Sequence, residues 1–275
     1  MRSICVACGT QFADAIAPPS HCPICDDIRQ YVPPGGQSWT DLDRLRRTHR
    51  NSVRRLEPNL LGIGVEPSFA IGQRALLVRT AAGNVLWDCI SLLDDGLVEL
   101  VNGIGGVAAI AVSHPHYYTT MVEWSHAFGR VPVYLHAADR EHVQRHDPVL
   151  QFWTGETQAL DGGLTLIRCG GHFAGGTILH WPAGADGRGA LLTGDVLQVT
   201  MDRQYVSFMR SYPNLIPLSA AAVNRIVDAV EPFEYDRIYG AWWDRHIDRG
   251  ARRAVRESCE RYRRALGADD PDAGS

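Results

Sequence analysis

The sequence of 275 residues contains no lysine, because all 27 of its basic residues are arginines. We attribute this bias to a GC-rich genome of bacterial type. The absence excludes every chemistry that needs a lysine amine. These are Schiff-base catalysis, the lysine anchor of pyridoxal phosphate and the GK[ST] phosphate-binding loop.

Long apolar runs are also missing. The most apolar stretch, residues 107–112, is far shorter than the roughly 18 residues that a membrane span requires. Residues 1–5 lack the apolar core of a secretory signal, so we expect a protein of the reducing cytoplasm with no membrane partner. The formal net charge of −4 gives no general attraction for nucleic acid, and we expect no nucleic-acid partner.

The seven cysteines are unevenly distributed, since four lie near the N-terminus as two CxxC pairs. The pairs are Cys5 with Cys8 and Cys22 with Cys25, and thirteen residues, 9–21, separate them. Each CxxC turn presents two thiolates to one ion, and two such turns complete a closed tetrahedral site for structural Zn²⁺. Chance clustering and a redox dithiol are the alternatives. Residues 3–30 resemble a zinc ribbon or a rubredoxin-like pair of knuckles.

This cysteine-rich segment has few apolar residues, so a bound ion would supply its folding free energy. We expect a bystander role for His21, next to Cys22. The isolated cysteines Cys89, Cys169 and Cys259 are expected to be small buried apolar residues rather than ligands.

The expected domain organisation starts with this ribbon and continues into a larger domain. The breaker cluster at 33–36 predicts a linker, and the spacing predicts a helix over 42–56 with solvated arginines. The ribbon is also a possible contact surface for a protein partner. The expected boundaries are a zinc-ribbon-like module at 1–32, a linker and helix at 33–58, the main domain at 59–266 and an acidic tail at 267–275.

The main domain alternates strand patterns with helix patterns, which predicts an α/β fold with helices on the outer faces of its sheets. The expected helices cover 91–102, 219–230 and 250–266. The expected strands cover 75–80, 84–89, 107–113, 131–136, 164–169, 177–181, 190–193 and 237–239.

Metal-ligand residues follow three of these strands. The strand 107–113 leads into His114 and His116, the strand 164–169 leads into a glycine-rich turn with His172, and the strand 190–193 leads into Asp195. Each pair or residue alone is consistent with an ordinary surface loop. Together they predict a single metal shell of three imidazoles and one carboxylate.

In these residues the sequence resembles the metallo-β-lactamase-fold superfamily over about residues 60–248. His114 and His116 match the first two histidines of its HxHxDH motif, His172 matches the third histidine, and Asp195 in Thr-Gly-Asp matches the bridging aspartate. Asp88 fits the aspartate of the second strand. The resemblance implies a four-layer αββα sandwich.

The departures from the family pattern concern the second metal position. Tyr118 and Thr119 replace the aspartate and histidine of HxHxDH, and Trp242 stands where a final histidine is expected. We therefore predict one ion at the main site and two per chain with the ribbon. His246 is the only later candidate for a returning ligand.

The resemblance implies a metal-dependent hydrolase that uses Zn²⁺ to activate water against a small-molecule substrate. Asp195 is a candidate catalytic residue besides its ligand role. Tyr118 is the other candidate, either orienting water and donating to an oxyanion or merely filling the vacated position. Two alternatives stay open: a mononuclear Fe²⁺ dioxygenase like the persulfide dioxygenases, and a metal-binding pseudo-enzyme that acts as an interaction module. The candidate pocket or core aromatics are Phe173, Trp153, Trp242 and Trp243.

Overall fold

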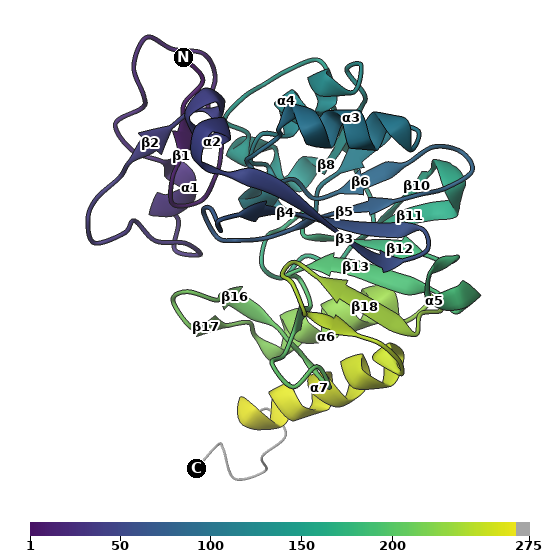
Figure 1. Cartoon of the computed structure of the whole chain (residues 1–275). Coiled ribbons are helices and arrows are strands. Elements are labelled where there is room, and N and C mark those ends of the chain that lie inside the picture. The colour runs from purple at the N-terminus through teal and green to yellow at the C-terminus, as the bar shows by residue number, and fades with distance from the viewer. Residues whose placement is uncertain (268–275) are drawn as a thin grey trace. The chain divides into compact units, whose positions relative to one another are not determined.

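The computed structural model describes residues 1–267, which form two compact units that divide between Thr154 and Gly155 (Figure 1). Each unit contains a sheet flanked by helices, so the predicted α/β class is confirmed. No helix in this part of the chain has the length and apolar character needed to cross a membrane. The predicted acidic tail lies, from residue 268 onward, outside the described residues.

The first unit is built on a seven-stranded sheet in the order β3-β4-β5-β6-β7-β8-β9. The pairs from β3 to β6 are antiparallel, and those from β6 to β9 are parallel. Because β6, β7 and β8 run the same way, their carboxyl ends meet at one edge of the sheet. The strands are β3 (Arg50–Glu57), β4 (Leu60–Glu66), β5 (Ala75–Val78), β6 (Val85–Trp87), β7 (Ala109–Ala111), β8 (Val133–His136) and β9 (Leu150–Trp153).

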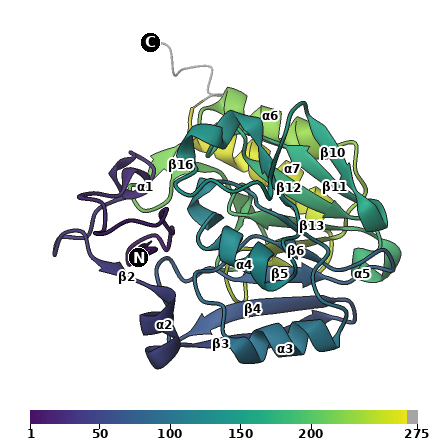
Figure 2. The ribbon, with the colours of Figure 1, turned by 90° about the horizontal axis from the view of Figure 1, so that it is seen from above.

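Helices α3 (Asp95–Gly103) and α4 (Met121–Ala127) connect the parallel strands and cover one face of this sheet (Figure 1 and Figure 2). Helix α3 begins later than expected because the side chain of Asp94 caps it, accepting from the main-chain N–H of Leu97. Helix α4 was not predicted. Short 3₁₀ turns cover Pro115–Tyr117, Ala137–His142 and, in the second unit, Asp161–Gly163.

The helix predicted over 42–56 is wrong in its second half. Helix α2 (Leu42–Thr48) is capped by Asp41, which accepts from Arg44 N–H, and it ends before strand β3. Residues 50–57 instead form β3, which pairs antiparallel with β4 as a hairpin. Tertiary pairing therefore overrides the local helical spacing. The arginines of this segment do form a solvated face, with Arg54 and Arg55 exposed.

The N-terminal ribbon is part of the first unit. Strand β1 (Ile4–Cys5) pairs with β2 (Trp39–Thr40), and the short helix α1 (Pro23–Asp26) carries the last cysteine. The breaker cluster at 33–36 thus lies inside the ribbon rather than at its end.

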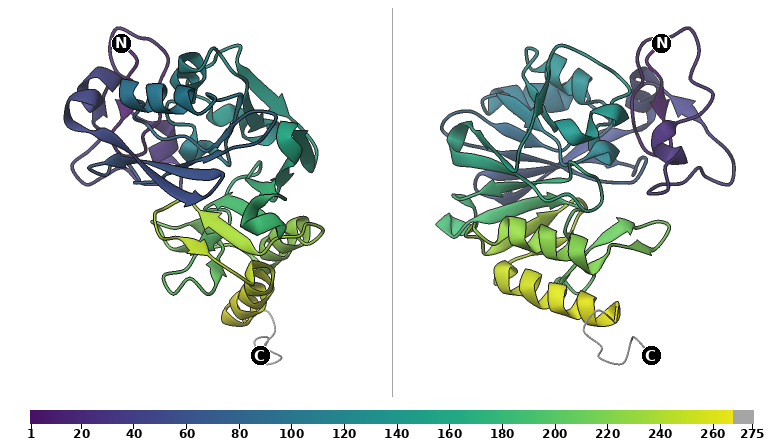
Figure 3. Two further views of the ribbon diagram at one scale, coloured as in Figure 1. Left: turned by 45° about the vertical axis from the view of Figure 1, so that its right-hand side comes forward. Right: turned by 180° about the vertical axis from the view of Figure 1, so that it is seen from behind.

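The second unit contains a six-stranded sheet in the order β10-β11-β12-β13-β18-β19. Strands β11, β13 and β18 run in one direction, so their carboxyl ends share an edge. Helices α6 (Ala220–Val230) and α7 (Ala251–Ala265) lie side by side and bury an apolar cluster against this sheet (Figure 3). The other elements are β10 (Thr157–Leu160), β11 (Leu164–Arg168), β12 (Thr177–Trp181), α5 (Gly184–Gly187), β13 (Ala190–Gly194), β14 (Gln198–Val199), β15 (Val206–Ser207), β16 (Met209–Ser211), β17 (Ile216–Pro217), β18 (Arg237–Gly240) and β19 (His246–Ile247).

Candidate metal centres

The four N-terminal cysteines form one buried cluster, whose sulfur atoms all lie within 4.8 Å of one another. The Sγ atoms of Cys5 and Cys25 are 3.6 Å apart, and those of Cys8 and Cys22 are 3.7 Å apart. Four sulfurs at the usual Zn–S distance around a tetrahedral ion lie about 3.8 Å apart, whereas a disulfide needs about 2.05 Å. The spacing therefore suits a shared ion.

The chemistry of these sulfurs also suits a cation. Hydrogen bonding from Cys22 lowers the pKa of the Cys5 thiol and raises that of Cys8 and Cys25, while hydrogen bonding from Cys25 lowers that of Cys22. The side-chain amide of Gln37 donates to Cys5 Sγ at 3.0 Å, which stabilises negative charge on that sulfur. Thiolates are the form of cysteine that binds metal.

The remaining cysteines match the expectation for small buried residues. Cys89, Cys169 and Cys259 are buried, and none belongs to a metal-ligand group of the described residues. Burial raises the pKa of Cys89 and of Cys169. His21 is exposed and pairs with Asp26 at 2.5 Å, so it is a bystander as predicted.

The ribbon contacts the loop that carries the first two histidines, within the same unit. The main-chain N–H of Gln11 donates to the carbonyl of Thr119 at 3.0 Å. The hydroxyl of Ser91 donates to the carbonyl of Gly9 at 3.0 Å. Gly9 has φ +82°, and a Cβ there would lie 2.2 Å from the Ser91 oxygen, so only glycine permits this approach.

Side chains reinforce this contact. The buried Gln11 accepts from Arg145 and donates to Glu123 at 3.3 Å. Arg145 in turn pairs with Glu123 at 2.7 Å, and Arg2 pairs with the same carboxylate at 2.8 Å. These two ion pairs lower the pKa of Glu123 against the opposing effect of its burial. The ribbon is therefore held to its own unit by a charged network.

His114 and His116 lie at the carboxyl edge of the first unit's sheet, just after β7. Both are buried, their rings are 5.2 Å apart, and they offer ligand nitrogens within 4.8 Å of each other. The hydroxyl of Ser113 lies 2.9 Å from Nδ1 of His114, a contact that fixes the orientation of the ring. Asp88, which follows β6, accepts from the main-chain N–H of Ser113 at 2.7 Å and so fixes the start of this loop.

Tyr117, Tyr118 and Thr119 complete this loop and are buried. The ring of Tyr117 packs 4.4 Å from that of His114. Burial, with a smaller effect of Asp139, raises the pKa of the Tyr118 phenol, so the phenol keeps its proton; its hydroxyl donates to the carbonyl of Asp139 at 3.5 Å. Thr119 has φ +33°, which is uncommon for a β-branched residue.

His172 and Asp195 lie at the carboxyl edge of the second unit's sheet. They are buried and offer ligand atoms within 4.8 Å of each other. His172 occupies the loop between β11 and β12, which Cys169 and Gly176 close through a main-chain hydrogen bond of 2.8 Å. Tyr212 donates to the carbonyl of Asp195 at 3.0 Å, and its ring lies 6.0 Å from that of His172.

The remaining candidate residues lie outside the group of His114, His116, His172 and Asp195. His246 stacks on Tyr239 and contacts Arg203 and Asp248, so it is committed to a surface ion-pair group. Of the aromatic candidates, Phe173 packs against His172, with ring centroids 5.0 Å apart. Trp153 packs against His136 in the first unit.

Three supporting residues were not predicted from the sequence. Ser113, Tyr212 and Gln11 each hold a ligand or its loop through a hydrogen bond. Ser113 precedes a candidate ligand and was available as a signal. Tyr212 and Gln11 act across long sequence separations, and no local pattern marks them.

No family model matches the chain. A relative of known sequence is the uncharacterized protein YmaE of Bacillus subtilis (strain 168), 46% identical over 268 residues, with 97% of each chain covered. Its description names no activity.

Solved metallo-β-lactamases share the fold of this chain. A B3 enzyme with an active-site glutamic acid is 18% identical, with 83% of this chain and 94% of that chain covered and a TM-score of 0.54. VMB-1 is 13% identical, with coverages of 79% and 98% and a TM-score of 0.59. The mono-zinc form of FIM-1 from Pseudomonas aeruginosa is 14% identical, with coverages of 77% and 95% and a TM-score of 0.55. The chain therefore has the metallo-β-lactamase fold, as its motifs suggested.

Proposed function

The chain belongs to the family of Bacillus subtilis YmaE, and from this premise and the metallo-β-lactamase fold we propose that it is a metal-dependent hydrolase. One ion would be held by His114 and His116 of the first unit together with His172 and Asp195 of the second. The observation that carries the proposal is the donor set. Each unit places a close pair of buried ligand-type side chains at the carboxyl ends of its strands.

The donor chemistry fits zinc. Three neutral imidazoles would hold the ion and leave the fourth tetrahedral position to water if the Asp195 carboxylate stands beside that water; with Asp195 bound as well, water would need a five-coordinate ion. Ser113 contacts the ring of His114, a common arrangement around metal-binding histidines, and Tyr212 holds the main chain at Asp195. Zinc bound by such ligands lowers the pKa of water to about 7 and thus supplies a nucleophile at neutral pH.

The protein's own groups have separate roles in this proposal. Asp195 brings the one negative charge of the set and accepts a hydrogen bond from the attacking group. Tyr118 keeps its proton because burial raises its pKa; its hydroxyl would have to turn from the carbonyl of Asp139, 3.5 Å away, to donate to a developing oxyanion. The main site binds a single ion, since Tyr118, Thr119 and Trp242 offer no good donor for a second. FIM-1, which has the same fold, has been solved in a mono-zinc form.

We propose that the ribbon cysteines hold a second, structural Zn²⁺. The two S···S distances near the tetrahedral value support this assignment, as does the full burial of the four sulfurs. A closed set of four thiolates leaves no position for substrate. In this proposal the cysteine site stabilises the fold, and the histidine–aspartate site carries out the reaction.

The test compares full-length wild-type protein with His116→Ala, using element analysis and hydrolysis of p-nitrophenyl butyrate and bis(p-nitrophenyl) phosphate. We expect two zinc ions in the wild type and one in the variant, with hydrolysis of at least one probe reduced about 100-fold or more. His21→Ala, an exposed histidine, is the matched control and should change neither quantity.

Other outcomes would replace the proposal. Iron in the main site with O₂ consumption would favour the dioxygenase alternative. Wild-type hydrolysis equal to that of His116→Ala would remove the catalytic role and leave a metal-stabilised pseudo-enzyme.

A further inference from the structure

A pocket of about 380 Å³ lies in the second unit, between the β14–β15 and β16–β17 hairpins and the turn that follows β18. Nothing in the motifs pointed to it. The lining residues that matter here are Val199, Met201, Met209, Leu215, Tyr212 and Arg245.

The pocket adjoins the second unit's metal-binding pair. Its wall residue Tyr212 donates to the carbonyl of Asp195 at 3.0 Å. On another side, the N–H of Gly240 donates to the carbonyl of Arg245 at 2.8 Å, and the next residue, Ala241, donates to Gly194 at 3.1 Å. Gly194 directly precedes Asp195. Two walls of the pocket are thus connected to the aspartate by one or two hydrogen bonds.

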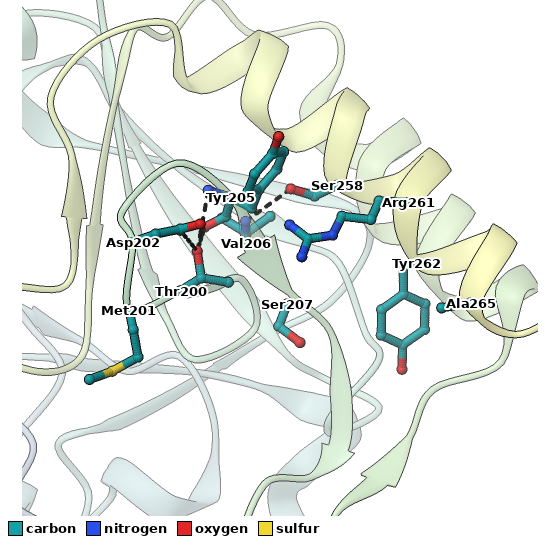
Figure 4. A pocket seen from close by; sticks show the side chains of 10 residues that line it. All are labelled: Thr200, Met201, Asp202, Tyr205, Val206, Ser207, Ser258, Arg261, Tyr262 and Ala265. Atoms are coloured by element: carbon teal, nitrogen blue, oxygen red, sulfur yellow. Dashed lines mark hydrogen bonds between the residues drawn. The ribbon is translucent and has the colours of Figure 1, made fainter.

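One part of the wall is apolar and open to solvent. Met201 is 79% exposed and Leu215 is 78% exposed, which are high values for large apolar side chains. In Figure 4, which shows the neighbouring cavity beside α7, Met201 points away from Arg261 and Ser258. Two exposed apolar side chains at the mouth of one pocket favour contact with an apolar ligand group.

The other part of the wall is cationic. Arg245 makes no ion pair with any described carboxylate, whereas nearby Arg203 pairs with Asp248 at 2.6 Å. Its guanidinium instead contacts the sulfur of Met201. A thioether is a weak acceptor, so a bidentate anion would be a better partner for the guanidinium fork.

We infer that this pocket binds an amphipathic carboxylate, with Arg245 on the carboxylate and with Met201 and Leu215 on the apolar part. The inference rests on the proposed function only in assigning this ligand as the substrate. For that ligand to be the substrate, its hydrolysable group would have to extend past Tyr212, which is hydrogen-bonded to the carbonyl of Asp195. The substrate class is then a small apolar acid with a hydrolysable group.

The test measures binding by calorimetry on the full-length protein, with phenylacetate and its uncharged analogue phenylacetamide as probes. We expect the wild type to prefer phenylacetate about tenfold, the difference that one charge-assisted pair supports. Arg245→Gln should abolish this preference without changing phenylacetamide affinity. Arg249→Gln, an exposed arginine outside the pocket, should keep it.

A second variant tests the apolar part. Leu215→Ser should weaken both probes equally, because it removes apolar contact without touching the charge. Equal affinity of the wild type for the two probes, no binding of either, or an equal loss in Arg245→Gln and Arg249→Gln would overturn the inference.

The same titration on His116→Ala separates this inference from the proposed function. We expect the preference for phenylacetate to survive there, since Arg245 lies in the other unit. Its loss would place the anion on the histidine site and refute the pocket. A lack of hydrolysis with retained binding would refute the enzyme and leave the pocket intact.

Discussion

The two groups of metal-ligand residues are assembled in different ways. The cysteine site comes from one short segment, Cys5 to Cys25, and its sulfurs lie 3.6 and 3.7 Å apart inside one unit. The histidine–aspartate set comes from distant segments between His114 and Asp195, with the first two histidines in one unit and His172 and Asp195 in the other. A closed cysteine site gains folding free energy from its ion, whereas the two pairs of the histidine–aspartate set are each held at the edge of a sheet. We expect damage to the two sites to have separable consequences.

The largest effect is expected from Cys22→Ser. Loss of one thiolate should release the ribbon ion, because structural zinc supplies most of the folding free energy of such a segment, about 10 kcal/mol or more in isolated fingers. Zinc analysis should give one ion instead of two, and hydrogen exchange should rise over residues 1–40 while the two sheets stay protected. The control Cys259→Ser, at a buried cysteine outside the site, should keep both ions. Unchanged zinc in Cys22→Ser would refute the assignment.

A change of metal number tests the distributed set. We expect the double variant Tyr118→Asp, Thr119→His to bind a third ion per chain, because it restores a carboxylate and an imidazole donor. Histidine also tolerates the left-handed φ of Thr119 better than threonine does. Zinc titration monitored by calorimetry measures the stoichiometry. Three ions in the unmodified protein would show that the missing ligands are misassigned.

The junction between the ribbon and the histidine loop gives a smaller effect. Gln11→Ala removes two side-chain hydrogen bonds, to Glu123 and from Arg145, and should lower the free energy of unfolding by about 1–2 kcal/mol. Hydrogen exchange should rise at residues 113–119. The exposed Gln151→Ala in the same unit is the control. Equal behaviour of the two variants would mean that the junction carries no stability.

The smallest effect concerns a buried imidazole outside both sites. Burial lowers the pKa of His180, whose Nε2 lies 2.9 Å from the carbonyl of Glu234. Its folded pKa is below the unfolded value of about 6.5, so the unfolded chain takes up the proton first and stability falls as the pH drops below that value. Relative to His180→Gln, the wild type should lose stability in denaturant titrations from pH 7 to 5. A difference independent of pH would contradict this.

The sequence predicted what depends on local spacing. The CxxC pairs predict the cysteine site directly. The order of His114, His116, His172 and Asp195 along the chain predicts the fold. The hairpin of β3 and β4 was missed because pairing between neighbours decides it. The Arg245 pocket was missed because its walls come from separate hairpins and turns. Contacts between residues far apart in the sequence produce no local pattern from which they could be predicted.

The hydrogen bond from Gln11 to Thr119 means that the ribbon cannot be removed without changing the rest of its unit. A shortened chain that began after the ribbon would expose the Thr119 carbonyl and the Ser91 hydroxyl to water. It would also uncover Leu92, against which Ile4 packs. Truncation directly after the cysteines would therefore remove the contacts that support the histidine loop, and a fragment that keeps this loop intact must start at the first strand of the ribbon.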